Sequence, residues 1–103
     1  MNWLLLSIAC VTPQRVERSQ SRTVLGTAYL NEGNPSDAIT ALEEATKLNP
    51  RNADAWEKLG LAYYAKSASE KAHEAFAKAI RLDPTKAEIR NNYGLILLKE
   101  GKV

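Results

Sequence analysis

The feature that most constrains this chain is an internal repeat, because from residue 19 onward the sequence matches itself after a shift of 34 residues. The recurring pairs are Leu25/Leu59, Gly26/Gly60, Ala28/Ala62, Tyr29/Tyr63, Ala38/Ala72, Ala41/Ala75, Ala45/Ala79, Leu48/Leu82 and Pro50/Pro84. They fall at helical spacing, as the packing face of paired helices requires. A repeat of this length predicts stacked two-helix units, since one unit alone is too small to bury its apolar face.

Turn residues place the helices of these units. Pro50 and Pro84 each end a helical segment, because the residue before a proline disfavours the α region. Asn34 and Pro35 suit the N-cap and the first position of a helix. We therefore predict an all-α chain with helices at about 20–32, 35–48, 53–65, 69–82 and 86–99.

Capping boxes are expected at two further helix starts. Ser67 with Glu70, and Thr85 with Glu88, have the spacing in which a hydroxyl and a carboxylate cap each other's backbone N–H groups. Both helices should then begin just after these hydroxyl residues.

The second repeat resembles the signature of the tetratricopeptide repeat (TPR) family. The residues that carry the resemblance are Trp56, Leu59, Gly60, Tyr63, Ala72, Phe76, Ala79 and Pro84. The first unit keeps Leu25, Gly26, Tyr29, Ala38, Ala45 and Pro50, and the third shows Gly94, with Tyr93 and Leu97 where the pattern has Leu and Tyr. The resemblance implies a helix-turn-helix solenoid that forms a right-handed superhelix. Its units would be two full repeats at residues 19–52 and 53–86 and the first helix of a third at residues 87–103.

Residues 1–10 form an apolar segment that ends in Cys10 and is too short to span a bilayer as a helix. Ser7-Ile8-Ala9-Cys10 resembles the lipobox of bacterial lipoproteins, which implies lipid attachment at Cys10. Residues 11–18 would then be a polar tether, and the uncharged Val11 predicts an outer-membrane lipoprotein that faces the periplasm. The alternative is a cytoplasmic protein whose first residues result from a misplaced start codon.

Composition argues against several classes of function. Lys and Arg number 14 against 12 Asp and Glu, without a basic block, so we expect no nucleic-acid partner. A single cysteine, Cys10, and a single histidine, His73, cannot supply a usual zinc site or a nucleophile–base pair. We therefore expect no enzymatic activity, no metal and no cofactor, and we interpret His73 as a partly buried packing residue.

A TPR-like superhelix has an inner groove lined by the first helix of each unit, and this groove is the candidate binding site. The residues predicted to line it are Thr23, Thr27, Leu30 and Asn31 in the first unit, Glu57, Leu61 and Tyr64 in the second, and Asn91, Leu95 and Leu98 in the third. Such a surface suits an extended or helical segment of a protein partner. In the alternative interpretation Leu61, Leu95 and Leu98 belong to the core.

The layout of a lipobox-like segment, a tether and TPR units resembles the type IV pilus biogenesis lipoproteins, or pilotins. This implies a role in assembling an envelope complex, with an outer-membrane secretin as partner. The alternatives are a soluble TPR adaptor and a TPR fragment or accessory domain of a larger protein. Because Leu95, Ile96, Leu97 and Leu98 make the last helix apolar nearly all round, we also expect self-association through it or a longer array.

Overall fold

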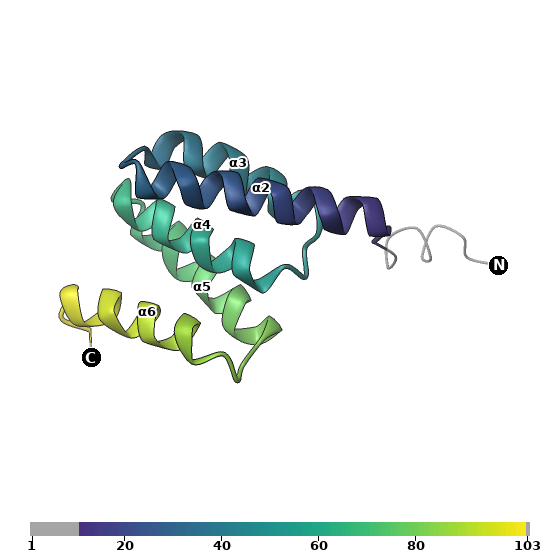
Figure 1. Cartoon of the computed structure of the whole chain (residues 1–103). Helices are drawn as coiled ribbons and strands as arrows, with labels where there is room; N and C mark the ends of the chain where they lie inside the picture. The colour runs from purple at the N-terminus through teal and green to yellow at the C-terminus, as the bar shows by residue number, and fades with distance from the viewer. Residues whose placement is uncertain (1–10, 103) are drawn as a thin grey trace.

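The computed structural model describes residues 11–102, which form five helices and no strand. The helices are α2 (Pro13–Asn31), α3 (Pro35–Leu48), α4 (Ala53–Ala65), α5 (Ser69–Leu82) and α6 (Ala87–Lys99). Figure 1 shows them stacked in chain order, from the pair α2 and α3 at one end to α6 at the other. The predicted all-α fold of stacked helices is confirmed.

Glycines let the two helices of a repeat approach closely. A Cβ at Gly60 would lie 2.7 Å from ring carbons of Phe76, and one at Gly26 would overlap the side chain of Leu42. Gly94 occupies the same register in α6, but a Cβ there would meet nothing within 4 Å. The close approach thus exists within α2–α3 and α4–α5, whereas α6 packs sparsely and mainly on α5.

Two apolar clusters hold the stack together. The first joins α3, α4 and α5 and contains Ala38, Leu42, Leu59, Ala62 and Ala75. The second joins α5 and α6 and contains Phe76, Ala79, Ile89 and Ile96. Trp56 packs against both, so α4 connects the first repeat to the third.

The first helix begins earlier than predicted. Thr12 caps it through a hydrogen bond from Arg15 N to Thr12 Oγ1 at 3.2 Å, and Pro13 opens the first turn. The Arg15 guanidinium donates to the carbonyl oxygens of Leu48 and Lys47, at 3.1 and 2.7 Å. Residues 13–18 are therefore helical, which corrects the expected tether over 11–18. Cys10 and the rest of the lipobox-like segment lie outside the described residues.

The predicted caps have mixed outcomes. Asn34 caps α3 as expected, accepting a hydrogen bond from Asp37 N at 3.3 Å. The two capping boxes were wrong, because the N-caps of α5 and α6 are Ala68 and Lys86, neither of which makes a side-chain cap. Ser67 instead lies in the turn that follows α4, where it has a left-handed φ of 62°.

Within residues 11–102, no helix has the length and apolar character needed to cross a membrane.

Candidate functional site

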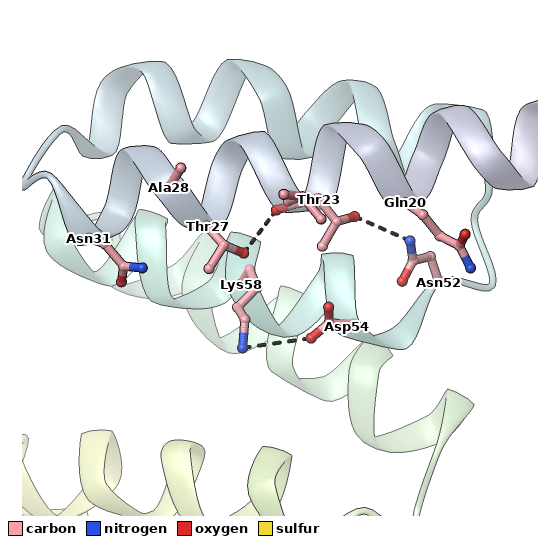
Figure 2. A pocket seen from close by; sticks show the side chains of 9 residues that line it. Gln20, Thr23, Thr27, Ala28, Asn31, Asn52, Asp54 and Lys58 are labelled. Carbon is pink, nitrogen blue, oxygen red and sulfur yellow. Dashed lines mark hydrogen bonds and ion pairs between the residues drawn. The ribbon is translucent and has the colours of Figure 1, made fainter.

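A groove of about 640 Å³ lies between α2 and α4. We call it the α2–α4 groove. It is lined by Gln20, Thr23, Val24, Thr27, Ala28, Asn31, Asn52, Asp54 and Lys58. Figure 2 shows the α2 side chains facing those at the start of α4. Most of the lining carries no charge, and the charged pair Asp54 and Lys58 lies on the α4 side.

Hydrogen bonds within the protein fix the polar floor of this groove. Thr23 and Thr27 each donate to the carbonyl oxygen four residues earlier in α2, at 2.8 Å. Asn52 caps α4 by accepting from Ala55 N at 3.1 Å. Its amide nitrogen also donates to Ser19 Oγ at 2.9 Å and to Thr23 Oγ1 at 3.2 Å. The distance between α2 and α4 is therefore set by side chains whose polar groups already have hydrogen-bond partners within the protein.

A group of three carboxylates, Asp54, Glu57 and Glu88, lies where α4 meets α6, and we call it the acid cluster. One oxygen from each lies within 4.8 Å of the other two. Lys58 lies among them, with its Nζ 3.3 Å from Glu88, 3.6 Å from Asp54 and 3.7 Å from Glu57. Because Asp54 and Lys58 also line the α2–α4 groove, the cluster is continuous with that groove.

The ionisable groups of this region respond differently to their surroundings. Burial raises the pKa of Glu57, although a hydrogen bond from Asn92 opposes the change. The hydrogen bond to Lys58 lowers the pKa of the exposed Glu88. Burial lowers the pKa of Lys58, but the surrounding carboxylates outweigh burial and raise it above its ordinary value. The ammonium group is therefore held in its charged form.

The structure brings together only part of the predicted groove. Thr23, Thr27 and Asn31 line the α2–α4 groove. The other predicted α2 and α4 residues pack inward: Leu30 contacts the first apolar cluster, Leu61 and Tyr64 contact the second, and Glu57 is fully buried. Asn91, Leu95 and Leu98 lie exposed on α6, outside this groove. Among the leucines with an alternative core assignment, only Leu61 packs against the core clusters.

Sequence reasoning missed Gln20, Val24, Asp54 and Lys58. The repeat itself carried a signal for them, because Gln20, Asp54 and Glu88 are spaced by 34 residues, as are Val24, Lys58 and Asn92. Each set occupies one position of successive first helices, so these side chains form rows across α2, α4 and α6.

His73 has a more specific role than the expected packing. It is half-buried, and its Nδ1 lies 2.6 Å from Tyr93 Oη while its Nε2 lies 2.9 Å from Glu100 Oε1. Tyr93 stacks on Phe76 with ring centroids 5.0 Å apart. The histidine therefore joins α5 to the middle of α6 and to its C-cap residue, Glu100.

Comparison with known proteins identifies the family of these helical repeats. The tetratricopeptide repeat family matches residues 23–87 and 69–103. The type IV pilus assembly protein PilF of Pseudomonas aeruginosa is 31% identical over 84% of this chain and 34% of its own length. The peroxisomal targeting signal 1 receptor of Dictyostelium discoideum is 40% identical over 56% of this chain and 9% of its own. This chain therefore spans about a third of the PilF length and a small part of the receptor.

Solved structures give the same result. That of Pseudomonas aeruginosa PilF has a TM-score of 0.82 and 30% identity, covering 86% of this chain and 40% of that one. That of PilW, described as a widely conserved type IV pilus biogenesis factor, has a TM-score of 0.76 and 32% identity, covering 82% of this chain and 39% of that one.

Proposed function

Because the chain belongs to the tetratricopeptide repeat family, a scaffold for protein binding, we propose that it holds a segment of a protein partner in the α2–α4 groove. The segment is extended or helical, and the protein assists assembly of an envelope complex such as a type IV pilus secretin. Support for the pilus role comes from PilF and PilW, whose names place them in pilus assembly and biogenesis. Support for the groove comes from its geometry.

The observation that carries the groove assignment is its lining. Val24 is 70% exposed on the wall of a groove whose polar floor is already hydrogen-bonded. A binding site that combines a few accessible apolar groups with fixed polar groups suits a peptide segment. Such a site needs little reorganisation when the partner binds.

The test is co-purification of the pilus secretin with the full chain from the native organism. Val24→Arg places a long charged side chain in the groove and should reduce secretin recovery about tenfold. Ala77→Arg adds the same charge at an exposed position of α5, away from the groove, and should leave recovery unchanged. Absence of the secretin from the wild-type sample, or equal loss with both variants, would contradict the proposal.

Anchoring is a separate part of the proposal. We infer that a lipid on Cys10 attaches the protein to the outer membrane, on the basis of the lipobox-like residues that precede Cys10. Cys10→Ser should then release the protein from membrane fractions and abolish incorporation of labelled palmitate. A wild-type protein that is already soluble at its unprocessed mass would instead favour the soluble TPR adaptor.

A further inference from the structure

The acid cluster, which borders the α4 side of the α2–α4 groove, holds more negative than positive charge. Asp54 and Glu57 of α4 and Glu88 of α6 present three carboxylates, and one ammonium group, that of Lys58, lies among them. All three distances from Lys58 Nζ exceed the approximately 2.7–2.9 Å of a good charge-assisted hydrogen bond. One flexible ammonium therefore spans three acceptors without fully satisfying them.

Glu57 supplies an independent observation. Its side chain is fully buried, and its Oε1 accepts no hydrogen bond from any residue between 11 and 102. Its Oε2 accepts from the amide of Asn92. A buried carboxylate oxygen normally has a donor, so Oε1 marks a place where a donor is missing. That oxygen faces Lys58, whose Nζ lies 3.7 Å from it.

We propose that the acid cluster is the subsite for an arginine side chain of the partner segment bound in the α2–α4 groove, and that Lys58 occupies this subsite when no partner is bound. A guanidinium has five N–H donors in a planar fork, which suits several carboxylates better than a compact ammonium. Lys58 then turns outward on its flexible chain, from a position where its side chain is already 18% exposed. This inference rests on the proposed groove function, and it specifies one side chain of the partner segment.

A divalent metal ion is the competing ligand for three carboxylates at this spacing. The surroundings favour a nitrogen cation instead. The Lys58 ammonium lies among the carboxylates, and Asn92 donates an N–H to Glu57 rather than offering its oxygen.

The test is an NMR titration of the full chain with two blocked pentapeptides, Ala-Ala-Arg-Ala-Ala and its citrulline analogue, which replaces the charge with a neutral group of the same shape. The arginine peptide should shift the side-chain amide of Asn92 and bind about tenfold more tightly than the citrulline peptide. Glu88→Gln, at a carboxylate that is 56% exposed, should weaken arginine binding at least about threefold. Glu74→Gln changes an exposed carboxylate of α5 and should have no effect.

Lys58→Gln tests whether the arginine displaces Lys58 from the acid cluster or only neutralises carboxylates that Lys58 leaves unpaired. If Lys58 competes for the subsite, its removal should tighten binding of the arginine peptide and leave the citrulline peptide unchanged. The melting temperature of each variant shows that it remains folded. Equal affinity for the two peptides would overturn the inference, as would calcium shifting Asn92 when the arginine peptide does not.

The outcomes also distinguish this inference from the proposed function. If Val24→Arg abolishes secretin recovery while arginine and citrulline peptides bind alike, the groove function stands and the arginine subsite is wrong. If the arginine peptide binds as expected but the secretin is not recovered, the subsite stands and the proposed pilus partner is wrong.

Discussion

The two junctions between successive repeats use the same register but different chemistry. At the first junction, Asn52 caps α4 and donates to Ser19 and Thr23 of α2. At the second, the position equivalent to Asn52 is Lys86, which gives α6 no side-chain cap. The hydrogen bonds between first helices are therefore neutral at one junction, while charged groups dominate the other.

The second helices of the repeats do not show this contrast, because a carboxylate takes part in the polar contacts at both junctions. The Tyr63 hydroxyl donates to Glu43 across the first junction at 2.5 Å. Across the second, His73 lies between the Tyr93 hydroxyl and Glu100. The contrast between neutral and charged contacts is therefore confined to the first helices of the repeats.

The largest effect should come from the glycines, whose surroundings differ between the complete repeats and α6. Gly60→Ala is expected to cost about 2–3 kcal/mol, because its Cβ would lie 2.7 Å from the buried Phe76 ring. Gly94→Ala should instead gain about 1 kcal/mol, since alanine favours the helix and the space beside Gly94 is open. Urea unfolding followed by circular dichroism measures both. A comparable loss at Gly94 would show that another helix or a second copy covers α6 in solution, as the apolar run Leu95–Leu98 predicts.

The capping difference gives the next effect. Asn52→Ala should lower the free energy of unfolding by about 1.5 kcal/mol, because it removes the α4 cap and the bonds to α2. Lys86→Asn should raise it by about 1 kcal/mol by giving α6 the missing cap. Thermal unfolding of both variants and of the exposed control Lys47→Ala checks the pair. No gain from Lys86→Asn would mean that an asparagine at this position cannot cap α6 as Asn52 caps α4.

Another effect concerns the turn that follows the first helix of each repeat. Gly33, Ser67 and Gly101 occupy equivalent positions, with φ of 75°, 62° and 70°. Only the serine has a Cβ to strain in this left-handed conformation, so Ser67→Gly should stabilise the protein by about 1 kcal/mol. Gly33→Ser should cost a similar amount. If both variants melt like the wild type, local strain does not limit stability at either turn.

The repeat period made most of the fold predictable, while contacts between distant residues were not. The bounds of α3, α4 and α5 follow from turn residues and apolar spacing. The start of α2 could not be predicted in this way, because residues 13–18 lack an apolar face. They are held by Arg15 and by Ser19, which donates to Ala45 O at 2.8 Å, and these bonds become visible only when α3 lies alongside.

The sequence could predict which helix face carries the candidate site, but not how deeply each residue on that face is buried. Thr23, Thr27 and Asn31 lie together along the α2–α4 groove because they share one face of α2. Glu57 was predicted on the accessible wall from the same register, but it is fully buried beside Asn92 and Lys58. Sequence spacing gives the direction of a side chain, whereas the depth at which it lies depends on how closely α6 approaches α4.

The smallest effect depends on pH and tests the charged junction alone. Burial raises the pKa of Glu57 above 4.5, so this group stabilises the fold below that value and loses its contribution as pH rises through the folded-state pKa. Glu57→Gln should therefore raise the melting temperature slightly at neutral pH, and the gain should vanish on acidification. Glu88 has a lowered pKa, so its contribution is present above 4.5 and is lost on acidification, and Glu88→Gln should lower the melting temperature slightly at neutral pH. Melting temperatures measured from acid to neutral pH should show these opposite signs. Variants that change stability in the same direction would mean that burial does not distinguish the two carboxylates.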